Sequence, residues 1–409
     1  MNVALPLSSL HAPGQHEAPR LHGITAYVQD GESEAVLHRL AAHLALPGFQ
    51  VRRGTIATAE RDLKTQRSPA MLFVDVTGVD RVLDAVRSLS DVCEPQLQLV
   101  VIGQSNDVGL FRGLLGLGVA DYLFKPLTAE LLESVVWRLT SGGPRGNAGR
   151  LGKLVAVTGA RGGAGASSVA ANLATYLAEK ASRRVALVDL DVRTGALALM
   201  LGAKPNSGLA ESLEVPGRID DLFLERATIS IGPRLDLLAS EMPAGRPQVM
   251  TIEAGEALLG RLQRSYHYVI IDVPMPLLDA CRPWLASANV QLLVTEGSLL
   301  GVRDAVQRLD AAAALSQRHI LIHNKAGRPG DLPAADFATA LGRPAACEIP
   351  FLPRAFGTAI NLGRPVWQED RRAETAVALV SRELSGQPVS AERASAWRPA
   401  WRRMLGLAT

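Results

Sequence analysis

The feature that most constrains this chain is a glycine-rich turn between an apolar run and an alanine-rich segment with helical spacing. The apolar run LVAVT leads into the turn GARGGAGASS. Because Gly162, Gly163 and Gly165 have no Cβ, their backbone N–H groups can curl around phosphate oxygens. The helix expected to start near Ser167 adds the positive end of its dipole, and the Ser167 hydroxyl stands where a phosphate loop needs a Mg²⁺ ligand. The turn therefore predicts a nucleotide-phosphate site; taken alone, a structural bend or a dinucleotide-binding loop is the alternative.

Apolar runs alternate with amphipathic segments on both sides of this turn. Hydrophobic residues make up 47% of the chain and aromatic residues only 4%. Such alternation predicts an α/β fold with two doubly wound domains, each a parallel sheet with helices on both faces. We expect a flexible arm over 1–20, a first α/β domain over 21–140, a linker over 141–152, a nucleotide-binding domain over 153–385 and a basic, Trp-containing tail over 386–409.

Acidic residues end two further apolar runs. RVALVDLD carries Asp189 and Asp191, and HYVIIDV carries Asp272. Because the carboxyl ends of parallel strands meet at one edge of a sheet, these side chains should lie beside the glycine-rich turn. Carboxylate and hydroxyl oxygens are ligands that suit Mg²⁺. Capping of a local turn is the alternative role for each aspartate taken alone.

The spacing R-G-G-x-G-x-S-S in the turn resembles the deviant Walker A motif of the ParA/MinD superfamily, K-G-G-x-G-K-[ST]-[ST]. Arg161 stands where that superfamily has its signature lysine, and Ala166 stands where it has the phosphate-loop lysine. Arg161 keeps a permanent positive charge that could reach phosphate, even across a dimer interface. Ala166 cannot neutralise phosphate, so the resemblance implies weakened ATP binding and, at most, weak ATPase activity.

The same resemblance implies ATP and Mg²⁺ as cofactors and assigns residues to them. Asp191 would orient the attacking water as the catalytic residue, and Asn324 would contact the adenine, with a plain strand-end polar residue as its alternative. The implied metal ligands are Ser167, Asp189 and Asp272. The implied nucleotide-binding residues are Arg161, Gly162, Gly163, Ala164, Gly165, Ala166, Ser167, Ser168 and Asn324.

The segment 21–140 resembles a response-regulator receiver domain of flavodoxin-type topology. Asp75 ends its third expected strand, where receivers carry the phospho-acceptor, and Lys125–Pro126 ends the fifth. Receivers also use an acidic pair after the first strand and a hydroxyl after the fourth. Here these sites read Gln29–Asp30 and Gly103. We therefore expect a pseudo-receiver that serves protein contacts.

The net charge and the length of the apolar segments bear on whether this chain binds nucleic acid or spans a membrane. A net charge of +3 is too small to predict nucleic-acid binding by itself. No segment approaches the roughly 20 apolar residues that span a bilayer, which indicates a cytoplasmic protein, polar or peripheral to the inner membrane. The tail pairs Trp397 and Trp401 with arginines and could bind a membrane surface or a partner weakly, with a packed or disordered tail as the alternative.

A degenerate receiver followed by RGGxGASS resembles the CpaE/TadZ family of Flp (tight-adherence) pilus assembly proteins over about residues 23–385. The resemblance implies a localisation or assembly factor for the pilus secretion machinery. It would form an ATP-biased homodimer through the ATPase domain, with pilus assembly and secretion proteins as partners. A ParA-type ATPase that positions DNA or cargo, a phosphorylation-driven regulator with an ATPase output, and a scaffold without nucleotide stay open. No specific nucleic acid is expected, because Ala166 argues against a DNA-moving ATPase.

Overall fold

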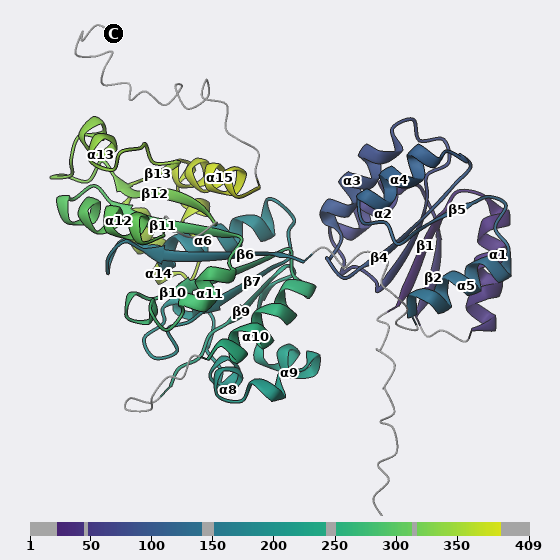
Figure 1. Cartoon of the computed structure of the whole chain (residues 1–409), viewed down its shortest axis with the longest axis horizontal. Helices are drawn as coiled ribbons and strands as arrows, with labels where there is room; N and C mark the ends of the chain where they lie inside the picture. Colours follow the sequence, from purple (N-terminus) through teal and green to yellow (C-terminus); the bar gives the residue numbers. More distant parts are fainter. Residues whose placement is uncertain (1–22, 45–47, 141–150, 243–250, 313–316, 386–409) are drawn as a thin grey trace, which may run out of the picture. The chain divides into compact units, whose positions relative to one another are not determined.

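The structure, a computed structural model, describes residues 23–44, 48–140, 151–242, 251–312 and 317–385. The expected arm and tail lie outside the described residues, as does the expected linker apart from its last two positions. The chain divides into two compact units, residues 1–149 and 150–409 (Figure 1).

The N-terminal unit is a parallel sheet of five strands in the order β2-β1-β3-β4-β5. Its strands are β1 (Ile24–Val28), β2 (Phe49–Arg53), β3 (Met71–Asp75), β4 (Gln98–Gly103) and β5 (Asp121–Phe124). Its helices are α1 (Gly31–His43), α2 (Ile56–Leu63), α3 (Val82–Val92), α4 (Val108–Gly116) and α5 (Ala129–Thr140).

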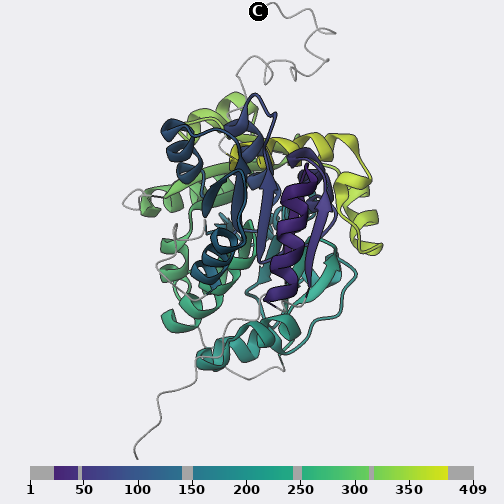
Figure 2. The same cartoon turned by 90° about the vertical axis from the view of Figure 1, so that its right-hand side faces the viewer.

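Helices cover both faces of this sheet, as Figure 2 shows. Apolar residues of α1 and α5 pack on one face, and those of α2, α3 and α4 pack on the other. The middle strand β3 is buried at every position, which explains its unbroken apolar run, since strands covered on both sides do not alternate. The expected flavodoxin-type topology of the first domain is confirmed.

The C-terminal unit is an eight-stranded sheet in the order β13-β12-β11-β6-β10-β7-β9-β8. Its strands are β6 (Lys153–Gly159), β7 (Val185–Asp189), β8 (Ile229–Gly232), β9 (Leu235–Leu238), β10 (Tyr268–Val273), β11 (Val290–Glu296), β12 (Arg318–Ala326) and β13 (Cys347–Pro350). The strands are parallel except β8, which pairs antiparallel with β9 at the edge. The apolar pattern did not predict β8, a four-residue strand with no fully buried position.

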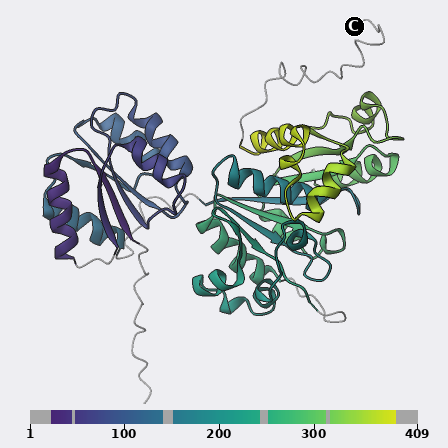
Figure 3. The same ribbon diagram turned by 180° about the vertical axis from the view of Figure 1, so that it is seen from behind.

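Helices on both faces of this second sheet complete the unit, which Figure 3 shows from behind. They are α6 (Ala166–Glu179), α7 (Leu197–Met200), α8 (Gly208–Glu214), α9 (Asp221–Ala227), α10 (Ile252–Ser265), α11 (Arg282–Ser287), α12 (Leu299–Ala312), α13 (Ala334–Ala340), α14 (Pro353–Asn361) and α15 (Arg371–Ser385). Three short 3-10 turns, η1 (Pro216–Arg218), η2 (Met275–Leu277) and η3 (Val366–Gln368), lie between them. Residues of α6 and α15 share one core cluster, and those of α8, α10 and α11 share the cluster on the other face.

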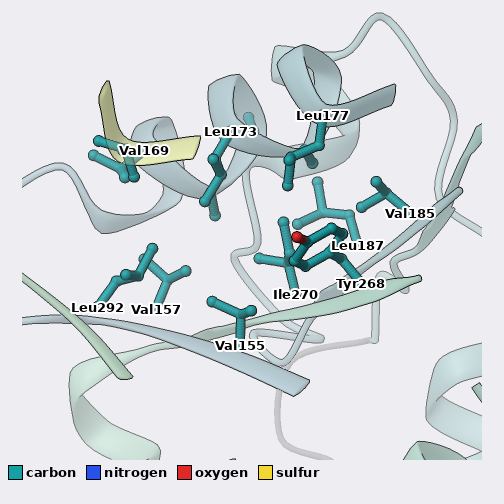
Figure 4. Packing of buried hydrophobic residues seen from close by; sticks show 14 of the residues in the cluster. Val155, Val157, Val169, Leu173, Leu177, Val185, Leu187, Tyr268, Ile270 and Leu292 are labelled. Carbon is teal, nitrogen blue, oxygen red and sulfur yellow. The ribbon is translucent and has the colours of Figure 1, made fainter. Parts of the chain in front are cut away.

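Strand β6 lies at the centre of the sheet, between β10 and β11. Val169, Leu173 and Leu177 of α6 point down onto the sheet, where Val155 and Val157 of β6 point up (Figure 4). This packing anchors the turn between β6 and α6 at both of its ends. The turn therefore starts and finishes on buried, regular elements, which gives it a fixed conformation.

Candidate nucleotide-binding site

The glycine-rich turn runs from the end of β6 to the start of α6. Gly163 has φ 79° and Gly165 has φ 93°, the left-handed region that favours glycine. A Cβ on Gly165 would lie 2.3 Å from the side-chain nitrogen of Asn324, whereas a Cβ on Gly162 would meet nothing within 4 Å. Glycine is thus required at 165 by a close approach, and the space beside Gly162 is open, as a phosphate-binding loop needs.

Two neighbouring residues at the end of β12 hold carbonyl groups of the loop. The side-chain amide of Asn324 donates to the carbonyl oxygen of Ala164 at 2.8 Å, and Lys325 Nζ donates to that of Gly163 at 2.6 Å. Asn324 is only 4% exposed, so its amide serves the loop in this structure. Its expected contact with adenine stays a prediction.

The acidic residues lie beside the loop because the strands that carry them are neighbours of β6. Asp272 of β10 is paired in register with Asp189 of β7. Both residues are buried, with 5% of Asp272 and 2% of Asp189 exposed. The Ser167 hydroxyl, in the first turn of α6, donates to the Asp272 carboxylate. The structure therefore brings together the three residues expected to serve Mg²⁺.

The electrostatics of these carboxyl groups suit a neighbouring cation. The pKa of Asp272 is raised to about 7: burial raises it most, the Ser167 hydrogen bond opposes this, and the charges of Asp189 and Asp191 add to the rise. Burial likewise raises the pKa of Asp189 to about 6, against hydrogen bonds from two backbone N–H groups. No positively charged side chain is among the causes of either shift. A cation placed here would stabilise both ionised forms.

The donor set suits Mg²⁺ held mainly by phosphate and water. Hydroxyl and carboxylate oxygens are hard ligands, and Mg²⁺ commonly uses one or two of them together with substrate phosphates. Among the described residues, no group of three or more His, Cys, Asp or Glu could enclose a metal by itself. The residues present thus fit a nucleotide-bound Mg²⁺ rather than an all-protein metal cage.

Asp191 lies just after β7, where its carboxylate faces its own turn. Its Oδ1 accepts hydrogen bonds from the N–H groups of Thr194 at 2.8 Å and Arg193 at 3.2 Å, and its Oδ2 accepts from the Thr194 hydroxyl at 2.7 Å. The turn-capping role is therefore present in this structure. The role in orienting water stays a prediction.

The two departures from the superfamily motif have different surroundings. Arg161 is half-buried within the loop, and its carbonyl oxygen accepts from the N–H of Ala164 at 3.3 Å. Ala166 begins α6, and its methyl group packs against the core cluster beneath the helix. Ser168 uses its carbonyl oxygen to accept from the side-chain amide of Asn172 at 2.8 Å. The position of the phosphate-loop lysine is thus taken by a core-packing methyl.

The sequence pattern missed four charged residues that bond to the loop or to one another beside it. Arg308 of α12 donates from Nε to the carbonyl oxygen of Ala160 at 3.1 Å. Glu296 at the end of β11 accepts from Lys325 at 3.3 Å and from Arg328 at 3.0 Å. Lys325 follows Asn324 directly, so its position in the sequence was a usable signal. Arg308 is 148 residues from its partner and carries no local signal.

Residues 150–232 match the model of a ParA family described as NUBPL iron-transfer P-loop NTPase. The septum site-determining protein MinD of Bacillus subtilis (strain 168) is 30% identical over 159 residues, which cover 38% of this chain and 57% of the relative. The C-terminal unit is a P-loop NTPase domain of the ParA/MinD type. The chain spans little more than half the length of the curated relatives that it matches, 56–57%.

The comparison with solved structures gives a match to the fold of this NTPase domain and a partial match to a second protein. The ParA family ATPase of Chlorobium tepidum TLS has a TM-score of 0.52 at 24% identity, covering 56% of this chain and 97% of that chain. A pilus assembly protein CpaE from Caulobacter crescentus CB15 is 32% identical with a TM-score of 0.29, and the match covers 30% of this chain and 95% of that chain.

In the described part of the sequence, no helix has the length and apolar character required to cross a membrane.

Outside the NTPase domain, a second cluster of polar residues occupies the carboxyl edge of the N-terminal sheet. Asp75 is fully buried, and Lys125 Nζ lies 2.5 Å from its Oδ2 and 2.5 Å from Oδ2 of Asp30. The other Asp75 oxygen accepts from the N–H of Thr77 at 2.9 Å. Burial raises the pKa of both carboxyls, but the hydrogen bonds from Lys125 and from neighbouring backbone and hydroxyl groups together outweigh it. They lower the pKa of Asp30 to about 2 and that of Asp75 below its usual range.

The position of the receiver hydroxyl is filled from the neighbouring strand. A Cβ at Gly103 would lie 2.4 Å from the hydroxyl of Tyr122. That hydroxyl donates to the carbonyl oxygen of Ser105 at 2.8 Å and accepts from the N–H of Ser105 at 3.2 Å. A serine or threonine side chain at 103 would therefore displace Tyr122. This arrangement supports the expected pseudo-receiver.

Proposed function

We propose that this chain is a nucleotide-binding localisation or assembly factor that forms an ATP-biased homodimer with weak or no hydrolysis. One observation carries the proposal: the loop has the Ser167–Asp272 pair of a Mg²⁺–nucleotide site, while the partly buried Ala166 packs against the core where the superfamily has a lysine. A site built in this way binds and orients nucleotide but lacks a charge that phosphoryl transfer uses.

The residues of the site divide the work of binding. Loop N–H groups around Gly163 and the N-terminus of α6 would surround the phosphates, because left-handed glycines turn those groups inward. Ser167 would bind Mg²⁺ directly, and Asp272 and Asp189 would hold it through water. Bound Mg²⁺ would supply positive charge against the phosphates and the two buried carboxylates.

Slow hydrolysis follows from what this chain lacks at the transferred phosphate. Catalysis of phosphoryl transfer consists almost entirely of positioning and electrostatic stabilisation. The loss of a lysine therefore lowers the rate of hydrolysis more than it lowers the affinity for nucleotide. Arg161 carries the one cation inside the loop sequence ARGGAGASS and would contact phosphate in its own chain or across the dimer. ATP would favour the dimer only to the extent that it binds the dimer more tightly than the monomer.

The finer proposal is a role in assembling the Flp pilus secretion machinery. Its support is the order of the two units, a pseudo-receiver followed by an NTPase domain with RGGxGASS. Gln29 stands where receivers carry an acidic residue, and Tyr122 fills the place of the receiver hydroxyl at Gly103, so the site is poorly suited to phosphorylation and its surface is left for protein contacts. Val108 and Phe124 are 64% and 46% exposed on this unit, as expected for such a surface.

Calorimetric titration of the purified full chain with ATP, ADP and Mg²⁺ tests the proposal, with light scattering on the same samples. We expect binding in the micromolar range and an ATP-dependent increase in mass. Arg161→Ala should lose the increase in mass, and Asp191→Ala should keep ATP binding. Absence of binding at millimolar ATP would leave a scaffold in which the loop is only architecture. Retention on DNA would instead favour a ParA-type role.

A further inference from the structure

Strand β12 ends in a distorted segment that faces the phosphate loop. Lys325 has φ 58°, and among the described residues other than glycine only Ser182 shares this left-handed conformation. The pairing of β12 with β13 shifts register between His323 and Ala326, which marks a bulge. A lysine held in this conformation stores strain that the surrounding contacts must support.

The bulge explains how two consecutive side chains reach one loop. In a regular strand, neighbouring residues point to opposite faces of the sheet. Here Asn324 and Lys325 both bond to the loop, at the adjacent carbonyl groups of Ala164 and Gly163. A β-bulge re-aims a side chain in this way. The strained backbone thus brings the lysine ammonium to the loop.

The contacts of the ammonium show how it is held. Lys325 Nζ lies 2.6 Å from the Gly163 oxygen and 3.3 Å from Glu296 Oε2. Glu296 is shared with Arg328, which also pairs with Asp331 at 2.9 Å. The two cations and two carboxylates of this group balance in charge, and Lys325 is the member bonded to the loop. Its side chain is 30% exposed, so the ammonium is accessible to a bound ligand.

We propose that Lys325 is the positioning lysine of this phosphate loop. It holds the Gly163 carbonyl so that neighbouring N–H groups face the phosphate, and it places beside the loop a positive charge that Ala166 does not supply. The inference rests on the proposed nucleotide binding and extends it to a residue outside the loop motif. Lys325 acts through the loop and the field it creates, and no step of hydrolysis is assigned to it.

Variants of Lys325 in the full chain test this role, with ADP–Mg²⁺ as the calorimetric probe at low and high salt. Lys325→Met keeps the length and the strained backbone but removes the charge, and Lys325→Arg keeps the charge. Lys204→Met is the matched control, because Lys204 is an exposed lysine of the same unit that lies outside the loop contacts. If Lys325→Met does not fold, Lys325→Asn replaces it, since asparagine tolerates the left-handed region.

We expect Lys325→Met to weaken ADP binding about 10-fold at low salt and by less at high salt, because salt screens the lost charge. Lys325→Arg and Lys204→Met should stay within about twofold of wild type. An unchanged affinity in Lys325→Met would overturn the proposal, as would a loss that is equal at both salt levels. Wild-type protein that binds no ADP would instead overturn the nucleotide function, and this role with it.

Discussion

The two units both place buried carboxylates at the ends of parallel strands, but they differ in the cation. In the N-terminal unit, Lys125 Nζ lies 2.5 Å from Asp75, and the pKa of Asp75 is lowered. In the NTPase domain, burial raises the pKa of Asp272 to about 7 and that of Asp189 to about 6, with no cationic side chain among the causes. The difference teaches that the first site (the closed site) contains its own cation, whereas the carboxylates of the second (the open site) have no cationic side chain among the causes of their raised pKa values, as the proposed Mg²⁺ site would need.

The largest expected effect comes from breaking the closed site. Lys125→Met leaves Asp75 buried without a cation and should lower the free energy of unfolding of the N-terminal unit by about 3 kcal/mol. Urea denaturation followed by circular dichroism measures it. The matched control is Lys64→Met, because Lys64 and Glu60 form an exposed pair at 2.8 Å that should be worth about 0.4 kcal/mol. Equal losses in the two variants would contradict the comparison.

The two units should also respond to pH with opposite sign. The folded pKa of Asp272 lies above its unfolded value, so the folded NTPase domain binds the extra proton, and its stability should rise by about 2 kcal/mol from about pH 7 to about pH 5 without Mg²⁺. The pKa of Asp30 is lowered to about 2, so the N-terminal unit loses stability only as pH falls from about 4 towards 2. Thermal unfolding across this range measures both trends. A stability of the NTPase domain that falls towards pH 5 would contradict the open site.

Removing the charge of the open site should stabilise the free protein. Asp272→Asn keeps an acceptor for Ser167 but removes a buried charge, so the metal-free NTPase domain should gain about 1 kcal/mol. The same variant should lose the Mg²⁺ dependence of ADP binding, measured by calorimetry. Asp279→Asn is the control, since that side chain is fully exposed. A lower melting temperature of Asp272→Asn without Mg²⁺ would contradict this, because it would show that the negative charge of Asp272 is already compensated within the protein.

The smallest effect concerns the hydroxyl position of the pseudo-receiver. Gly103→Ser should cost about 1 kcal/mol, the low end for overpacking, because the atom it meets is the far end of the Tyr122 side chain. It should not bring labelling of Asp75 by acetyl phosphate, since Gln29 still stands where a receiver has one of its two acidic residues. Gly116→Ser, where an added Cβ meets nothing within 4 Å, is the control for stability. Labelling of wild-type Asp75 would reopen the regulator alternative.

The features that could be predicted from the sequence are those that a short sequence pattern determines. The strand–turn–helix around Gly163 and the burial of β3 follow from a glycine pattern and an unbroken apolar run. The proximity of Asp272 to Ser167 followed from the rule that parallel strands end at one edge of the sheet. These inferences need only the order of elements along the chain.

The other contacts of the site could not be predicted, because they join residues of different elements that no short sequence pattern links. The bulge that turns Lys325 toward the loop lies between His323 and Ala326, a segment that itself contains no glycine or proline. Arg308 of α12 bonds to Ala160 although the two are 148 residues apart, and Tyr122 fills the space at Gly103, so each role is set by a neighbouring element. Contacts of this kind become visible only when the elements have been placed in space.

The methyl group of Ala166, which packs against the core where the superfamily has a lysine, has a consequence for how long a bound state would last. In a nucleotide switch that hydrolyses ATP, hydrolysis limits the lifetime of the ATP-bound state. Without hydrolysis, the ATP-bound state would end only when the nucleotide dissociates and another molecule takes its place. Such a protein would report the balance of ATP and ADP around it, and its assemblies would last for as long as that balance holds.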